Sequence, residues 1–185
     1  MSANPQYVPG PTGYGMAIEL DGTGDYITLP IGSAIAEMND ITVATWANFP
    51  NLGGAWQRLW DFGTGEDNYM FVSPRIGTNG PLRFAINTDT VPETNINGLA
   101  TLPLGWHHVT VTIDSASMTV KLYQDGKLVA EGETPVLPSD LGQTTQNYLG
   151  RSQFVADAYY QGSIDEFRIY DRALSLPEVL YLVGI

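Results

Sequence analysis

The chain has 185 residues, of which 20 are acidic and 8 are basic, so its formal net charge is -12 near neutral pH. A charge of that sign repels a phosphate backbone, which argues against nucleic acid as a partner. The length fits one domain that can bury a substantial apolar core. Because the chain has no cysteine, neither a disulfide framework nor a thiolate metal site can hold the fold.

Apolar residues alternate with polar ones in run after run, and long helical periodicity is rare. In residues 41–49, for example, Ile41, Val43 and Phe49 fall on one face of an extended strand. Strict alternation of this kind is typical of strands whose one side is buried. The pattern therefore predicts a β-sandwich rather than an α/β layer fold.

A three-stranded meander is predicted in the middle of the chain. The alternating runs 106–113 and 118–123 are separated by a short link, which favours a hairpin. Next, Asp125-Gly126 supplies the residue pair that a type I′ turn requires, so residues 127–130 are expected to fold straight back.

The remaining elements follow from the same patterns. Further strands are expected at residues 15–20, 25–29, 57–62, 69–73, 82–87, 145–150 and 161–170. Two short helices are expected at 32–38 and 176–182, the second opened by a capping box of Ser175 and Glu178. Residues 1–12 are expected to form an extended lead-in to a single domain that spans 1–185.

Several segments in order carry a resemblance to a known family. They are residues 17–27 (AIELDGTGDYI), 42–46 (TVATW), 57–63 (QRLWDFG), 105–109 (GWHHV), 122–126 (LYQDG), 162–170 (GSIDEFRIY) and 172–175 (RALS). Together they resemble the laminin-G-like jelly-roll domains of bacterial polysaccharide-degrading enzymes. The resemblance implies an all-β fold, a two-sheet antiparallel jelly-roll sandwich of the concanavalin A-like lectin/glucanase type.

The resemblance also implies a function. Such domains are commonly attached to glycoside hydrolases or polysaccharide lyases and also occur in adhesins, so a binding role is expected more than any particular ligand. We expect a non-catalytic carbohydrate-binding module whose partners are a polysaccharide or oligosaccharide and an attached catalytic domain. The parent protein is expected to be secreted, with its export signal outside this segment, because residues 1–10 lack the features of a signal peptide. The alternatives are an adhesion or scaffold domain that binds protein, and a glycosidase or lyase.

The sequence offers no convincing catalytic group. Glu19-Leu20-Asp21 begins the Glu-x-Asp-x-x-Glu pattern of retaining glycosidases, but Gly24 stands where the last glutamate belongs. His107 and His108 are neighbours on a strand and point to opposite faces, so they cannot act on one substrate atom. No catalytic residue is therefore predicted.

A structural calcium ion is predicted from strand parity. Asp165 is in phase with Phe167 and Ile169, which should face the core, and a carboxylate there is costly to bury without a cation. The loop 20–25 adds Asp21 and two glycines, and oxygen ligands of this kind suit Ca²⁺.

The family resemblance implies the same ion between the N-terminal loop and the aspartate of the last long strand, which gives a predicted metal site of Asp21, Gly24 and Asp165. The alternative is that Asp21 caps a turn while Asp165 pairs with Arg168 or Arg172.

Sugar-binding chemistry is concentrated in residues 53–69. Aromatic rings stack on the apolar faces of sugars, and Arg, Asp and Asn side chains select hydroxyl orientation. A second cluster, 147–160, could converge on the same surface. The candidate ligand-binding residues are Trp56, Arg58, Asp61, Asn68, Tyr69 and Arg151. The alternative interpretation is a buried Arg58–Asp61 ion pair with Trp60 in the core.

Overall fold

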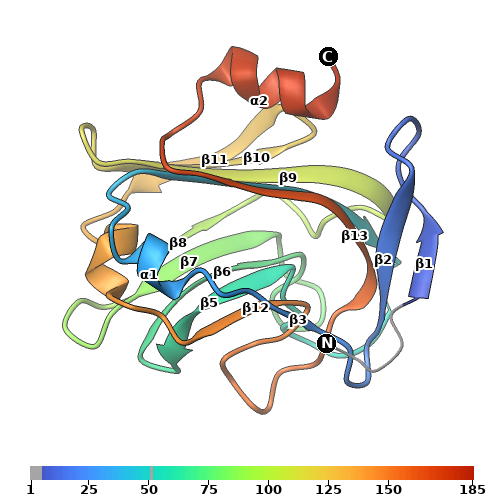
Figure 1. The fold of residues 1–185 in the computed structure, drawn as a ribbon, viewed down its shortest axis with the longest axis horizontal. Coiled ribbons are helices and arrows are strands. Elements are labelled where there is room, and N and C mark those ends of the chain that lie inside the picture. The colour runs from blue at the N-terminus through green and yellow to red at the C-terminus, as the bar shows by residue number, and fades with distance from the viewer. Residues whose placement is uncertain (1–5, 51) are drawn as a thin grey trace.

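A computed structural model describes residues 6–50 and 52–185, and it places them in two antiparallel sheets packed face to face (Figure 1). The seven-stranded sheet contains, in spatial order, β1 (Gln6–Pro9), β2 (Met16–Asp21), β13 (Gln161–Tyr170), β4 (Ile41–Phe49), β9 (Gly105–Asp114), β10 (Thr119–Gln124) and β11 (Lys127–Glu133). The six-stranded sheet contains β3 (Ile27–Thr28), β12 (Gln146–Leu149), β5 (Trp60–Gly65), β6 (Asn68–Ser73), β7 (Arg83–Asn87) and β8 (Thr94–Asn97). The predicted two-sheet jelly-roll sandwich is confirmed.

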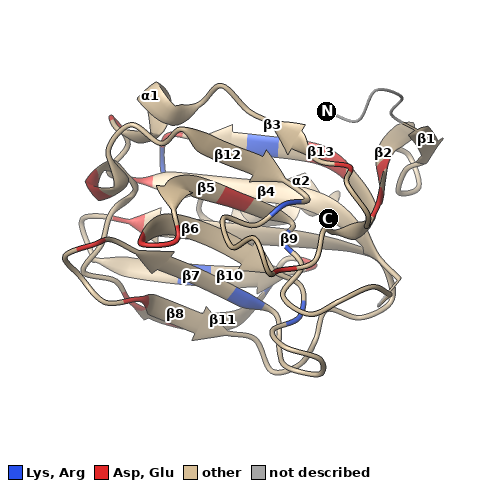
Figure 2. Cartoon of the chain, turned by 90° about the horizontal axis from the view of Figure 1, so that it is seen from below, with Lys and Arg blue, Asp and Glu red and all other residues tan. Residues whose placement is uncertain are grey.

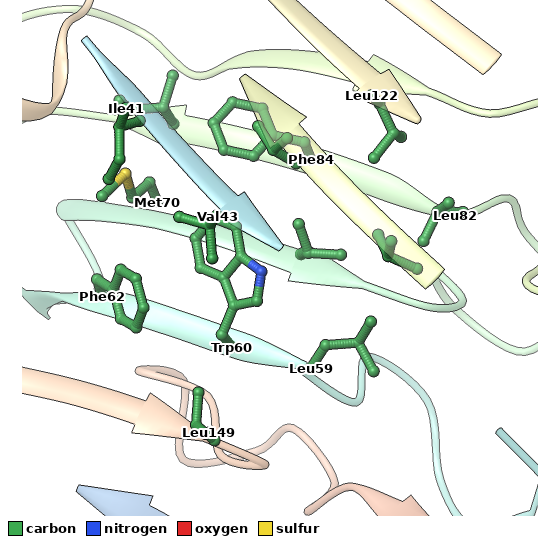
Figure 3. Close-up of a cluster of buried hydrophobic side chains, with 14 of the residues drawn as sticks. Ile41, Val43, Leu59, Trp60, Phe62, Met70, Leu82, Phe84, Leu122 and Leu149 are labelled. Atoms are coloured by element: carbon green, nitrogen blue, oxygen red, sulfur yellow. The ribbon is translucent and has the colours of Figure 1, made fainter. Parts of the chain in front are cut away.

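The core lies between the two sheets and is built by the alternating residues of both (Figure 3). Trp60 and Phe62 of β5 point into it, and Val43 of β4 meets them from the other sheet. Because side chains alternate along a strand, Asp61 between the two aromatic residues projects from the opposite, outer face of the six-stranded sheet. That alternation positions the candidate site described below.

The predicted meander is confirmed by the strand pairing. β9 pairs with β10, and β10 pairs with β11. At the second turn Asp125 and Gly126 have φ values of 51° and 75°, as a type I′ turn requires at both central positions.

Helical segments are few and short: α1 (Gly32–Ile35), the 3-10 helix η1 (Pro138–Leu141) and α2 (Leu176–Val183). The capping box of Ser175 and Glu178 opens α2 as predicted, and Figure 1 shows this helix lying across the outside of the seven-stranded sheet. None of the helices in the described part of the chain is long and apolar enough to cross a bilayer.

Two edge strands escaped the sequence analysis. Residues 6–9 of the expected lead-in form β1 and pair with β2, while residues 1–5 lie outside the described residues. β8 lies at residues 94–97, where no strand was expected, and it pairs with β7. Only one of its four residues, Ile96, packs in the core, so the strand shows no alternation that could be recognised.

A β-bulge in β13 overturns the parity assigned to Asp165. The register of β13 against β4 shifts between Asp165 and Arg168, and Glu166 has a φ of 47°. As a result Ile164 and Phe167 both pack on the core, although they are three residues apart. Asp165 therefore lies opposite Trp46 on the outer face, and the prediction that it shares the core face with Phe167 is wrong.

His108 of β9 also faces outward, yet it is buried beside Trp46, with ring centroids 5.3 Å apart. Burial lowers the pKa of His108 to about 4, Asp125 opposes this shift and Arg168 adds to it. Between about pH 6.5 and pH 4, the His108 imidazole is therefore neutral in the folded protein but protonated in the unfolded chain.

We predict that this burial makes the domain sensitive to acid. As pH falls from about 6.5 to about 4, the unfolded state takes up the His108 proton first, so the free energy of unfolding decreases by up to about 3 kcal/mol from this group. Urea titrations of the wild type and of His108→Gln across this range measure the difference. Equal pH slopes for the two proteins would contradict the prediction.

Candidate functional site

A pocket of about 250 Å³ opens on the outer face of the six-stranded sheet. Its lining residues are Trp56, Arg58, Tyr69, Phe71, Glu93, Phe154 and Asp157. They come from β6 and from three segments outside the strands, at residues 56–58, 93 and 154–157. Figure 2 looks onto this face, with β12, β5, β6, β7 and β8 following one another across it. On the neighbouring strand β7, Ala85 lies directly opposite Phe71, and both residues belong to one buried cluster on this face.

The buried guanidinium of Arg58 forms the floor of the pocket. It lies 3.8 Å from the centroid of the Phe71 ring. Its Nε is 3.3 Å from Oδ2 of Asp61, its Nη2 donates to Oδ2 of Asp157 at 2.8 Å, and its Nη1 donates to the carbonyl of Trp56 at 2.6 Å. Each of its three nitrogens is thus engaged, and two carboxylates compensate its charge.

Asp61 is the most deeply buried carboxylate of the site. Its Oδ2 also accepts the backbone N–H of Gln153 at 3.2 Å, whereas its Oδ1 has no hydrogen-bond partner among the described residues. Burial raises the pKa of Asp61 to about 7, although the Arg58 guanidinium opposes the shift. A carboxyl group that titrates near neutral pH therefore lies beneath the pocket.

One wall of the pocket combines a ring with a hydrogen-bond network. The hydroxyl of Tyr69 donates to Oε2 of Glu93 at 2.8 Å, and Oε1 of Glu93 accepts from Nδ2 of Asn95 at 3.1 Å. Burial and the adjacent Glu93 both raise the pKa of Tyr69, so the phenol keeps its proton. Phe154 packs edge-on against Tyr69, with ring centroids 5.5 Å apart.

Trp56 occupies a left-handed backbone conformation with a φ of 59°. A bulky residue rarely adopts this region, and it persists only where its surroundings impose it. Here the hydrogen bond from Arg58 to the Trp56 carbonyl holds the backbone, and the guanidinium groups of Arg58 and Arg83 lie 5.6 Å and 5.7 Å from the ring centroid. The half-buried indole is fixed at the pocket.

The structure brings together Trp56, Arg58, Asp61 and Tyr69 of the predicted ligand-binding residues. The alternative interpretation is also realised, because Arg58 and Asp61 form a buried ion pair next to Trp60 in the core. Asn68 does not line the pocket: its Nδ2 donates to Oγ1 of Thr64 and to the carbonyl of Leu141. Arg151 lies outside the pocket, among tyrosine rings. Ligand binding by these residues stays a prediction.

Two lining residues were missed by the sequence analysis. Phe71 belongs to an uninterrupted apolar run on β6, which hides the fact that its side chain faces outward. Glu93 lies between the expected strands, where nothing in the sequence indicates its contact with Tyr69. By contrast, Phe154 and Asp157 belong to the second predicted cluster, which does converge on this surface.

The structure does not assemble the predicted metal site of Asp21, Gly24 and Asp165. Asp21 lies opposite Gln161, four residues before Asp165 on β13, and four residues of strand span about 13 Å. The carboxylate of Asp21 accepts the backbone N–H groups of Thr23 and Gly24, at 2.8 Å and 3.2 Å, as in the turn-capping alternative. Across the described residues there is no cluster of three or more His, Cys, Asp or Glu side chains arranged for a metal ion.

Asp165 nevertheless has an unsatisfied oxygen. Its Oδ1 accepts the backbone N–H of Glu166 at 2.8 Å, but its Oδ2 is buried and has no hydrogen-bond partner in the described chain. Neither Arg168 nor Arg172 pairs with it, since these arginines bind Glu166 and Glu178. Burial raises the pKa of Asp165.

We predict that Arg58 is required for stability. Arg58→Met leaves Asp61 buried without its cation, which costs about 3 to 5 kcal/mol. The loss should be larger above pH 7 than at pH 5, because a protonated Asp61 needs no counter-charge. Urea denaturation of the single variant and of Arg58→Met/Asp61→Asn measures this, and the double variant should regain part of the loss. A double variant that is less stable than Arg58→Met would contradict the role of the ion pair.

Comparisons with known proteins match this architecture. The profile of the concanavalin A-like lectin/glucanase superfamily matches residues 21–180. Domain 4 of a GH43 extracellular arabinanase from Geobacillus stearothermophilus, solved in complex with arabinotriose, superposes with a TM-score of 0.83 at 23% identity, over 98% of this chain and 82% of that one. The CBM40 domain of a Ruminococcus gnavus IT-sialidase, bound to α2,3 sialyllactose, gives a TM-score of 0.76 at 21% identity, over 91% and 96% of the two chains.

A curated relative is matched over a short stretch. An alpha-L-arabinofuranosidase from Bifidobacterium longum subsp. longum is 28% identical over 80 residues, which is 43% of this chain. The matched stretch amounts to only 7% of the length of that enzyme. At these identities the solved structures establish the shared fold and leave the ligand to be argued from the pocket.

Proposed function

Since the chain belongs to the concanavalin A-like lectin/glucanase superfamily, we propose that it is a carbohydrate-binding module whose ligand occupies the pocket above Arg58. The observation that carries the proposal is the composition of the pocket. Aromatic rings and fixed hydrogen-bonding groups converge on one concave site, which is the arrangement that sugar binding requires.

The rings supply the apolar contacts. Trp56, Tyr69 and Phe154 line the pocket from different segments of the chain, so a sugar ring that enters meets aromatic surface on more than one side. Trp56 is held by its backbone geometry and Tyr69 by its bond to Glu93. Rigid rings lose little conformational entropy on binding, which favours affinity in a small site.

The charges favour a neutral sugar. The one guanidinium of the floor is already engaged by Asp61 and Asp157, and Glu93, which pairs with Arg83 at 3.5 Å, adds a further acceptor. Hydroxyl groups can donate to carboxylate oxygens, whereas an acidic sugar would be repelled by them. Among the solved relatives, arabinotriose is the neutral type of ligand and sialyllactose the acidic type, and the pocket fits the neutral type.

We further propose that the module is non-catalytic and serves a secreted glycoside hydrolase or polysaccharide lyase. Both carboxylates that line the pocket are held by neighbours: Asp157 binds Arg58 and Ser152, and Glu93 binds Tyr69. Carboxylates tied in this way suit ligand orientation better than proton transfer. The arabinanase that contains the similar domain is extracellular, which supports the same location for the parent of this chain.

We predict that Trp56→Ala weakens binding of a neutral oligosaccharide by about 1 to 3 kcal/mol, because it removes a half-buried aromatic ring from the lining of the pocket. Tyr69→Phe should weaken binding less, since the ring remains and only the bond to Glu93 is lost. Isothermal titration calorimetry with arabinotriose measures both.

The matched control for these variants is Tyr181→Ala, an aromatic truncation on α2 at a side chain that is 79% exposed. It should bind like the wild type. If wild-type protein bound none of a broad panel of neutral glycans, or if Trp56→Ala bound them unchanged, the proposed function would be wrong.

We also propose a structural calcium ion, held by Asp165 without the participation of Asp21. A Cβ built on Gly10 would lie 2.5 Å from Oδ2 of Asp165 and 3.2 Å from the carbonyl oxygen of Gly15. Because Gly10 has no side chain, both oxygens border the same small space, and the Gly15 carbonyl also accepts the backbone N–H of Gly10 at 2.8 Å. Carboxylate and carbonyl oxygens are the ligands that Ca²⁺ prefers, and an unpaired buried carboxylate oxygen is otherwise costly.

We predict that a chelator lowers the melting temperature of the wild type by several degrees, because an ion that binds only the folded state stabilises it. Asp165→Asn should melt at the same temperature with and without chelator. Asp21→Asn, which removes a carboxylate from the neighbouring strand, should keep the chelator effect. Chelator-insensitive melting of the wild type would refute the calcium proposal.

A further inference from the structure

Arg151 differs from every other arginine in the described chain. Its half-buried guanidinium has no hydrogen bond and no ion pair with any described residue. The other five arginines each have at least one hydrogen bond to a carboxylate, amide or carbonyl oxygen; they are Arg58, Arg75, Arg83, Arg168 and Arg172. In a chain with an excess of twelve negative charges, an arginine without an acceptor is an exception that calls for a physical reason.

Tyrosine rings hold Arg151 instead. Its guanidinium carbon lies 4.7 Å from the ring centroid of Tyr26, 4.9 Å from that of Tyr148 and 6.0 Å from that of Tyr159. Cation–π contact fixes the plane of the guanidinium but satisfies none of its five N–H donors. The protein therefore orients the N–H donors of Arg151, but the described residues supply no acceptor for them.

This cluster adjoins the pocket above Arg58. Tyr148 of β12 lies opposite Asp61 of β5, and Asp61 lies opposite Phe71 of β6. Tyr148 is therefore two strand spacings, about 10 Å, from the ring beneath the pocket, on the same face of the sheet. A second, smaller hollow is lined by Arg151 and Tyr159, and its lining shares Phe154 and Asp157 with the main pocket.

We propose that Arg151, with Tyr26, Tyr148 and Tyr159, forms a second carbohydrate subsite that takes a further residue of the glycan chain bound in the pocket. The inference rests on the proposed function and deepens it: the ligand is an oligosaccharide of at least two residues. The sugar hydroxyl oxygens accept from the guanidinium, and the half-exposed rings supply apolar surface.

Because the two hollows adjoin each other, a neutral sugar chain that spans both is favoured over a separate anion as the ligand of the second hollow. The two hollows share Phe154 and Asp157 in their linings, and Val155, which lines the smaller one, is 91% exposed. The carboxylate of Asp157 belongs to both hollows, and it would repel an oxyanion that approached Arg151 while accepting a hydroxyl.

Calorimetric titration with arabinose, arabinobiose and arabinotriose tests the subsite. In the wild type, the dissociation constant should fall at least tenfold from the monosaccharide to the longer chains. Arg151→Met and Tyr159→Ala should lose most of this gain and bind arabinose as the wild type does. Arg151→Lys should lose part of it, because an ammonium group keeps the charge but lacks the planar set of donors.

Lys127→Met is the matched control, since it also removes one positive charge, from an exposed residue at the start of β11. It should keep the full gain with chain length. Melting curves establish that each variant is folded, and Tyr159→Ala tests the subsite independently if Arg151→Met is unstable.

The possible results separate this inference from the proposed function. The subsite would be overturned if the dissociation constants of both Arg151→Met and Tyr159→Ala still fell tenfold from arabinose to arabinotriose. It would also be overturned if Arg151→Met weakened the binding of arabinose as much as that of arabinotriose, because that would place Arg151 in the main pocket. The inference would also be overturned if Arg151→Met kept the tighter binding of arabinotriose but lost a binding of sialyllactose that the wild type shows. That result would identify an oxyanion site at Arg151. A wild type that binds none of these sugars, with xylotriose as a second neutral probe, would contradict the proposed function itself.

Discussion

The buried guanidinium of Arg58 connects the parts of the site. It packs on the Phe71 ring of the sheet, pairs with Asp61 from β5, and reaches across to Asp157 and to the Trp56 carbonyl in the covering segments. The loops above the six-stranded sheet are therefore fixed to its outer face through one side chain. A buried ion pair contributes little net stability compared with an apolar replacement of both partners, although removal of one partner alone is costly. It also permits few alternative arrangements of the groups around it.

The same interaction determines what the pocket can accept. Because the cation is neutralised within the protein, the groups left for a ligand are aromatic faces, the network of Tyr69 and Glu93, and the remaining acceptor capacity of Asp157. Outside the pocket, Oδ2 of Asp165 and the donors of Arg151 have no partner among the described residues. We assign a missing partner to each of these groups, a cation to the first and a sugar hydroxyl to the second.

Most of the fold could be predicted from the sequence, because alternation in long strands is a local signal. The bounds expected for β4 and β13 coincide with the observed ones, and the Asp125-Gly126 turn has the expected geometry. The bulge at Glu166 could not be predicted, since one inserted residue reverses the side on which Asp165 lies without any local mark.

The site was predictable in part. Trp56, Arg58, Asp61 and Tyr69 stand close together in the sequence and meet in the structure, and the 147–160 cluster joins them through Asp157. Glu93 could not be assigned, because its place depends on a hydrogen bond to a tyrosine 24 residues away. Asp21 was misassigned because a carboxylate before a glycine suits a turn cap and a calcium ligand equally well.

We propose that sugar binds on the outer face of the six-stranded sheet, above Arg58. The chain has four tryptophans, and each lies in a different place, so the NMR signals of their indole N–H groups report the position of a ligand. On addition of arabinotriose, the account predicts that the Trp56 signal shifts and that those of Trp46 and Trp106, on the other sheet, do not. A shift of Trp46 or Trp106 with Trp56 unchanged would contradict it.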